Sequence, residues 1–209
     1  MCCMNKVCTG CEFEAQKRGM WDCPFCRAPR SDESQILAMI RKRVVAGDPI
    51  AICSLGNQYR FGRNGLEENI TRAVELYERA AELGVKEAHN MLGGLYATGY
   101  KVEKDMANAF RHFEAAATCG LASARYNLGS MEYNDGNYDL ALQNYLISAK
   151  LGDDPSLNCI KKMFMAGLAT KDDYAAALRG YQIAIQEMSS PDRDQAGECT
   201  QLSKQTAHL

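Results

Sequence analysis

The sequence predicts an all-α fold, an α-solenoid of stacked helix pairs that follows a small cysteine-rich module. Three observations lead to this prediction. A pattern of small and aromatic residues recurs through residues 47–190. Within it, apolar residues are spaced by 4 and by 7 or 8 positions, which is the spacing of one face of an α-helix. Six of the ten cysteines lie in the first 26 residues, before the recurring pattern begins.

The N-terminal segment, residues 1–30, carries two Cys-x-x-Cys pairs, Cys8 with Cys11 and Cys23 with Cys26. Two thiolates at this spacing can bind one ion from a tight turn, and two such turns supply the four sulfurs of a tetrahedral zinc site. A segment this short buries too little surface to fold alone, so a metal would supply its folding energy. We therefore expect a zinc-binding module here. The alternative is a set of reduced cysteines that bind no metal.

The same residues resemble part of a known zinc module. Cys-Cys-x4-Cys-x2-Cys followed by Cys-Pro-Phe-Cys-Arg is similar to the second two-thirds of a RING-type zinc finger. The chain departs from that family at Asn5, where a histidine ligand is usual, and it lacks the family's first ligand pair. The resemblance implies these zinc ligands: Cys3, Cys8, Cys11, Cys23 and Cys26, with Cys2 as a further candidate.

Three ways of completing the module stay open at this point. The segment is a truncated or degenerate RING, or its two intact pairs form one four-cysteine site, or a longer reading frame carries the missing pair. RING domains recruit ubiquitin-conjugating enzymes, and the resemblance extends to Trp21, Pro24 and Arg27, which match that family's contact surface. The alternative for Trp21 is packing in the small zinc core, and for Arg27 a solvated surface charge.

A polar linker and a capping helix follow in residues 31–46. Ser31 or Ser34 is suited to cap the helix, and acidic residues suit its first turn. We expect the helix over residues 35–46 to cover the end of the solenoid.

The recurring unit has two halves, each typical of one helix. The first half, A-x3-LG-x2-Y-x2-G, begins at Ala51 and again at Ala88, and the second, A-x3-(Y/F)-x2-AA-x2-G, begins at Ala73 and again at Ala109. A third copy begins at Ala124, with a loop four residues shorter between its helices, and a fourth copy is looser. Each helix pair is too small to bury its apolar face alone, so stacking is obligatory. The copies are expected at about residues 47–83, 84–119, 120–151 and 152–188.

This pattern resembles the Sel-1-like repeat, a relative of the tetratricopeptide repeat. The resemblance implies a right-handed α-solenoid that binds other proteins. A plain tetratricopeptide unit fits the shortened third copy better and the first two copies less well. Secreted members of the family staple each repeat with a disulfide, but Cys53, Cys119 and Cys159 fall singly in the repeats. We expect these three to be reduced and buried.

Polar residues on the first helix of each repeat are the candidate partner-binding residues. Amide and guanidinium groups there could hydrogen-bond the backbone of an extended peptide in a groove. The alternative for each is an ordinary polar helix residue. The candidates are Asn57, Arg60, Asn90, Asn127 and Ser130.

The sequence excludes several other function classes. No phosphate-binding loop, nucleophile elbow or metalloprotease motif is present, and the three histidines, His89, His112 and His208, form no catalytic pattern. A formal net charge of −2 indicates no nucleic-acid partner, and no apolar stretch is long enough to predict a membrane partner. The polar, aperiodic tail, residues 191–209, is expected to be disordered.

The expected function is therefore that of a protein–protein interaction adaptor, with a solenoid groove and a zinc module. The alternative is a RING-type ubiquitin ligase, in which the module positions a conjugating enzyme and the repeats select the substrate. The absence of an apolar secretion signal predicts an intracellular location, cytoplasmic or nuclear.

The zinc prediction can be checked by metal analysis of the purified protein. We expect about one or two zinc ions per chain. Cys23→Ser should lower the zinc content because it removes a thiolate ligand, whereas Cys199→Ser in the tail should leave it unchanged. A well-folded wild-type protein without zinc would refute the prediction.

Overall fold

The computed structural model describes Ala15, residues 17–19 and residues 33–189. From residue 33 onward every regular element is an α-helix, so the all-α prediction is confirmed for this part of the chain. The helices are α2 (Glu33–Val45), α3 (Pro49–Phe61), α4 (Ile70–Glu82), α5 (Lys86–Thr98), α6 (Met106–Thr118), α7 (Ala122–Asn134), α8 (Tyr138–Lys150), α9 (Asp154–Met165) and α10 (Lys171–Met188).

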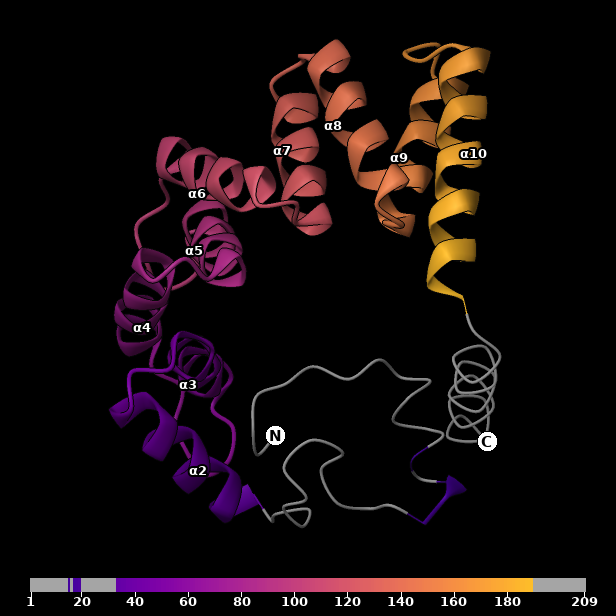
Figure 1. The fold of residues 1–209 in the computed structure, drawn as a ribbon. Helices are drawn as coiled ribbons and strands as arrows, with labels where there is room; N and C mark the ends of the chain where they lie inside the picture. Colours follow the sequence, from indigo (N-terminus) through magenta and orange to yellow (C-terminus); the bar gives the residue numbers. More distant parts are fainter. Residues whose placement is uncertain (1–14, 16, 20–32, 190–209) are drawn as a thin grey trace, which may run out of the picture.

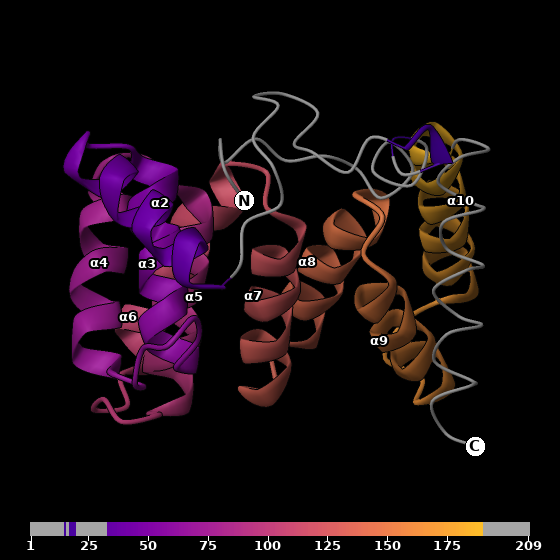
Figure 2. The same ribbon diagram turned by 90° about the horizontal axis from the view of Figure 1, so that it is seen from below.

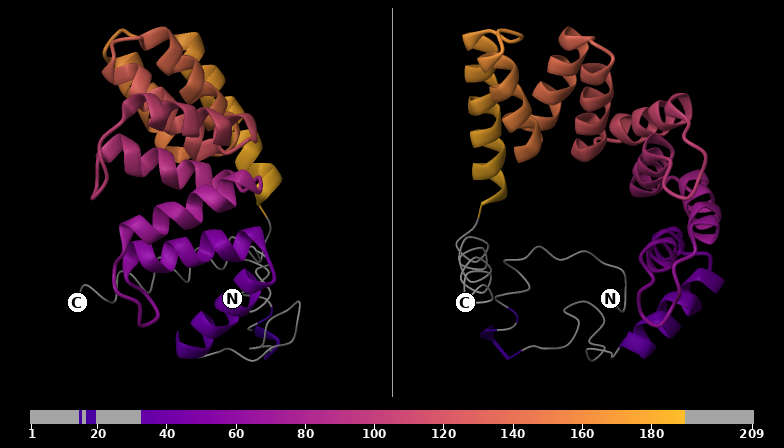
Figure 3. Two further views of the ribbon diagram at one scale, coloured as in Figure 1. Left: turned by 90° about the vertical axis from the view of Figure 1, so that its left-hand side faces the viewer. Right: turned by 180° about the vertical axis from the view of Figure 1, so that it is seen from behind.

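The helices pack in consecutive pairs, α3 with α4, α5 with α6 and α7 with α8, and α10 contacts both α8 and α9. The pairs follow a curved arc with α2 at one end and α10 at the other, and α3 and α5 lie inside α4 and α6 (Figure 1). Seen from below, α2–α6 form one side of the arc and α9 and α10 the other (Figure 2). Successive pairs stack on one another in the side view (Figure 3). The predicted α-solenoid is confirmed.

Helix ends follow from local residue chemistry. The Asp48 carboxylate accepts hydrogen bonds from the backbone N–H groups of Ile50 and Ala51 at 2.9 and 3.2 Å, and Pro49 occupies the first turn, where it loses no hydrogen bond. Asn69, Asp105 and Asp153 cap α4, α6 and α9 in the same way. The glycines that close the second half of the first three copies have left-handed backbones, a conformation that glycine adopts readily where a helix ends. They are Gly84, Gly120 and Gly152, with φ of 84°, 75° and 84°.

Helix α2 is shifted slightly from its predicted range of 35–46, since it spans Glu33–Val45. Its chain turns away at Gly47, where φ is 78°, so Ala46 lies outside the helix. Leu37 and Ile40 are buried against α3, and α2 thus covers the apolar face that α3 presents at this end of the arc.

A close contact between a glycine and an aromatic ring recurs in the first three helix pairs. A Cβ atom added to Gly56, Gly93 or Gly129 would lie 2.7, 2.7 or 2.8 Å from the ring on the second helix of the same pair. Those rings are almost fully buried, with exposed fractions of 0 to 3%. They belong to Tyr77, Phe113 and Tyr145. The missing side chain therefore lets each ring lie directly against the backbone of the first helix.

The fourth copy lacks this contact. Lys161 stands where the earlier copies have the glycine, and Tyr181, which corresponds to Tyr77, is partly exposed. Ser156 replaces the first alanine of the pattern, and its hydroxyl is buried without a hydrogen-bond partner. The looser sequence match therefore corresponds to a different packing between α9 and α10.

The glycine contact can be tested with two adjacent residues. Gly93→Ala should lower the free energy of unfolding by about 1–3 kcal/mol, because its Cβ meets the buried Phe113 ring. Gly94→Ala is the matched control, since nothing lies within 4 Å of the added Cβ. It should raise the free energy of unfolding by about 0.5–1 kcal/mol through helix propensity. Urea unfolding measures both, and equal effects would contradict the packing described.

Candidate functional site

The structure brings two of the predicted groove residues together. Asn90 on α5 and Asn127 on α7 belong to the first helices of successive pairs, and both are half-buried. The Asn127 side-chain amide donates a hydrogen bond to the Asn90 carbonyl oxygen at 3.1 Å. Within the described part of the chain, the Asn90 amide N–H groups and the Asn127 carbonyl oxygen have no other partner. The pair therefore presents one free donor and one free acceptor side by side.

Arg60 also joins successive first helices. Its guanidinium donates to the Met91 sulfur across α3 and α5 at 3.1 Å, and it lies 5.1 Å from the centre of the exposed Phe61 ring. The guanidinium of Arg63 lies 4.9 Å from the same ring. The end of α3 thus carries two cations against one exposed aromatic ring, in a geometry typical of cation–π contacts.

The remaining groove candidates are used inside their own repeats. The Tyr77 hydroxyl donates to the Asn57 carbonyl oxygen at 2.8 Å, and the Tyr145 hydroxyl donates to Ser130 at 3.1 Å. Asn57 and Ser130 occupy the same position of the repeat, where the second copy has Gly94 opposite a phenylalanine. Burial raises the pKa of Tyr145 to about 12, so this donor stays protonated at neutral pH. Asn57 and Ser130 therefore satisfy a buried hydroxyl.

A histidine pair lies in the second repeat. His89 on α5 and His112 on α6 are half-buried, and their Nδ1 atoms are 3.0 Å apart. The Tyr96 ring stacks on His112 with ring centres 5.8 Å apart. Burial lowers the pKa of both histidines, and the neighbouring His89 and Arg111 lower that of His112 further. The helical pattern alone did not reveal this contact, because the two residues lie 23 positions apart.

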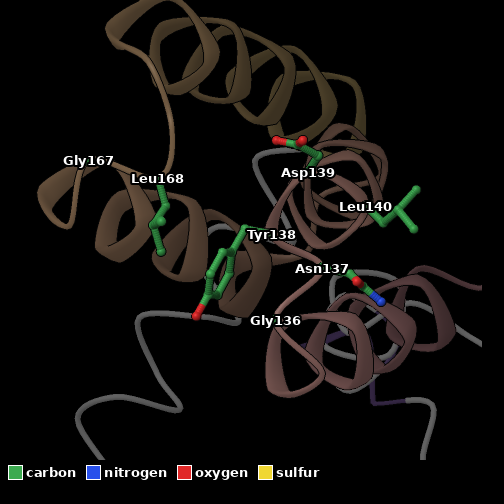
Figure 4. Close-up of a pocket in the computed structure, with 7 residues that line it drawn as sticks. All are labelled: Gly136, Asn137, Tyr138, Asp139, Leu140, Gly167 and Leu168. Atoms are coloured by element: carbon green, nitrogen blue, oxygen red, sulfur yellow. The ribbon is translucent and has the colours of Figure 1, made fainter.

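A shallow pocket of about 520 Å³ opens between the α7–α8 turn and the α9–α10 turn (Figure 4). It lies beside the loop that is shortened in the third repeat. The Tyr138 ring at its rim packs edge-on against Tyr133. The lining residues are Gly136, Asn137, Tyr138, Asp139, Leu140, Gly167 and Leu168. They bring together no acid–base pair and no set of metal ligands.

The described residues contain neither a cluster of metal ligands nor a membrane span. Neither Ala15 and residues 17–19 nor residues 33–189 hold a group of three or more His, Cys, Asp or Glu side chains suited to a metal ion. No helix in the same ranges is both long enough and apolar enough to span a bilayer.

Within the described residues, Cys53, Cys119 and Cys159 form no disulfide with one another, and they are not all buried. Cys53 is buried and Cys159 is half-buried. Cys119 is exposed, so the prediction that it is buried was wrong. It follows the last residue of α6 and precedes Gly120, where the chain turns toward solvent.

Several predicted sites lie outside the described residues. They are the zinc ligands Cys2, Cys3, Cys8, Cys11, Cys23 and Cys26, the conjugating-enzyme surface Trp21, Pro24 and Arg27, and the tail, residues 191–209.

The repeats match a known family. The family model described as Sel1 repeat matches residues 49–85, 86–121 and 122–153, which agree closely with the first three predicted copies.

The chain is similar to parts of much longer curated proteins. It is 31% identical over 104 residues to the ERAD-associated E3 ubiquitin-protein ligase component HRD3B of Arabidopsis thaliana, covering 49% of this chain and 16% of that protein. It is 29% identical over 129 residues to chitin synthase regulatory factor 4 of Schizosaccharomyces pombe, covering 60% of this chain and 20% of that protein. It is 28% identical over 121 residues to protein sel-1 homolog 2 of Mus musculus, covering 56% of this chain and 17% of that protein. The chain thus spans a fifth or less of each of these relatives.

Two solved structures share the fold. A protective antigen of uropathogenic Escherichia coli strains superposes with a TM-score of 0.61 at 26% identity, covering 77% of this chain and 34% of that one. A Sel1 repeat protein from Oxalobacter formigenes superposes with a TM-score of 0.54 at 31% identity, covering 61% of this chain and 98% of that one.

Proposed function

The chain belongs to the Sel1-repeat family, and on this premise we propose that it is an adaptor that holds an extended segment of a partner protein along its first helices. The Asn90–Asn127 pair carries the proposal. Its free donor and free acceptor match the carbonyl and N–H groups that an extended backbone presents on one edge.

The charges and relatives support the same role. Arg60 and Arg63 at the end of α3 favour acidic or aromatic side chains on the partner near that end. Two of the relatives are a component of a ubiquitin ligase and a regulatory factor of chitin synthase. Roles of this kind depend on binding other proteins.

We place the adaptor inside the cell, in the cytoplasm or nucleus. Cys53 and Cys159 of the packed repeats are not joined in a disulfide, and a reducing compartment keeps cysteines in this state. The two Cys-x-x-Cys pairs of the first 30 residues would hold zinc there.

The groove can be tested with a phage-displayed library of random 12-residue peptides, screened against the full chain. Selected peptides should lose at least about tenfold in affinity to Asn90→Ala/Asn127→Ala, measured by calorimetry, because two hydrogen bonds are lost. Gln143→Ala, an exposed change on the second helix α8, is the matched control and should bind as wild type does. If the selected peptides bind the Asn90→Ala/Asn127→Ala variant as tightly as they bind the Gln143→Ala control, the binding surface does not include the asparagine pair.

A second candidate function is a RING-type ubiquitin ligase, which the spacing of Cys8, Cys11, Cys23 and Cys26 favours. Here the N-terminal module would position a ubiquitin-conjugating enzyme through Trp21, Pro24 and Arg27, and the repeats would select the substrate. A ligase of this type needs no nucleophile of its own, so the lack of a catalytic motif is compatible with it.

The ligase candidate predicts ubiquitin-chain formation by the full chain with at least one member of a panel of conjugating enzymes. Trp21→Ala/Arg27→Ala should reduce the rate at least about tenfold, because both residues belong to the proposed contact surface. The groove variant Asn90→Ala/Asn127→Ala should keep the rate when no substrate is added. Failure of the wild-type protein with every conjugating enzyme would eliminate this candidate.

A further inference from the structure

In the first three repeats, one position on the first helix and one on the second hold a pair of side chains that differs from copy to copy. In the first copy the pair is Ile52 and Leu76, which both pack in an apolar cluster. In the third copy the Arg125 guanidinium donates to the Asn144 carbonyl at 3.4 Å. The second copy has His89 and His112 at this position. Of the three pairs, only the histidines change their charge between pH 5 and pH 8.

The distance between the two imidazoles requires that one of them accept a hydrogen bond. Their Nδ1 atoms are 3.0 Å apart, so a single proton lies between them, donated by one ring and accepted by the other. When both rings are protonated, each Nδ1 carries a proton and neither can accept. The contact between α5 and α6 then becomes a contact between two cations.

The charged side chains that act on His112 are His89 and Arg111, and both are basic. On α6, Arg111 adds a positive charge that acts on His112. On α5, the Tyr96 ring stacks on His112, and the acids that act on this ring are Glu78 of α4 and Asp105 at the start of α6. On α7, which packs against α6, the Arg125 side chain is directed to Asn144. The pair therefore faces a tyrosine and a cation, with the nearby acids acting on the tyrosine.

We propose that the His89–His112 pair is a pH-sensitive joint, which holds α5 and α6 together at neutral pH and loosens them when both imidazoles are protonated. Asn90 follows His89 on α5, so loosening would also disturb the Asn90–Asn127 pair. That consequence rests on the proposed function, whereas the joint itself does not.

The sign of the effect follows from the burial of the rings. Burial lowers the pKa of both histidines in the folded chain, so the unfolded chain takes up protons first as the pH falls. The contribution of the neutral histidine pair to the stability of the folded chain is complete above the ordinary imidazole pKa of about 6.5. It decreases as the pH falls below that value and is lost once the pH passes the lowered pKa values of the folded state.

Transplanting the neighbouring pairs tests the joint. His89→Ile/His112→Leu installs the pair of the first copy, and His89→Arg/His112→Asn installs that of the third, so each double variant carries side chains that this frame already accommodates. Between pH 7.5 and pH 5.0 we expect the Tm of the wild type to fall by at least about 4 °C more than that of either variant. A shift of this size corresponds to about a tenfold change in the folding equilibrium, or about 1.4 kcal/mol.

Hydrogen exchange locates the effect within the chain. At pH 5.0, after correction for intrinsic exchange rates, amides of α5 and α6 in the wild type should lose protection relative to those of α3 and α4. In the Ile/Leu variant this difference should disappear. An equal pH dependence of Tm in all three proteins, or a loss of protection spread evenly over the repeats, would overturn the proposal. Neither measurement needs a groove ligand, so the joint and the groove can fail separately.

Discussion

In the first three helix pairs, the contact between a glycine on the first helix and an aromatic ring on the second determines how closely the two helices approach. Gly56, Gly93 and Gly129 leave no room for a side chain, since an added Cβ would overlap the facing ring. The ring is therefore buried against the backbone of the first helix in all three copies. Where Lys161 replaces the glycine, the matching tyrosine moves into partial exposure. The regular part of the arc therefore extends as far as this contact does.

The loops that join the two helices of a repeat differ in length without changing the contact between glycine and ring. In the first two repeats the loops are long, and Glu68 receives hydrogen bonds from Tyr100 and Lys101 of the next repeat at 2.8 and 2.6 Å. The third repeat joins its helices with only residues 135–137, and the shallow pocket lies there instead. The glycine contact of that repeat is nevertheless as close as in the others, at 2.8 Å. Loop length costs little free energy compared with a buried contact, so the edge can change while the core does not.

The periodicity of the sequence predicted the positions of the helices, because each helix has its own apolar spacing. The spacing of apolar residues indicated the helices, because it depends on neighbours in sequence. Contacts between helices were less visible. The bond between Tyr77 and Asn57 joins residues 20 positions apart, and the histidine contact joins residues 23 apart. Aligning the copies indicates the first of these, since Asn57 is replaced by glycine in the one copy whose tyrosine is a phenylalanine. The exposure of Cys119 was missed because a cysteine at a helix end gives no signal of its direction.

A frame fixed by glycine and aromatic residues lets neighbouring positions differ without changing the fold. The position of the His89–His112 pair shows this directly, because an aliphatic pair, a histidine pair and an arginine–asparagine pair occupy it in three successive copies. The same holds for the free polar groups, since Asn90 and Asn127 meet across copies although they do not occupy equivalent positions. Residues shared by all copies therefore specify the architecture, and residues that differ between copies specify what each part of the surface can bind or sense. For this chain the second repeat combines both roles, because His89 and Asn90 are adjacent on α5, one facing the partner helix of its own pair and the other the next pair.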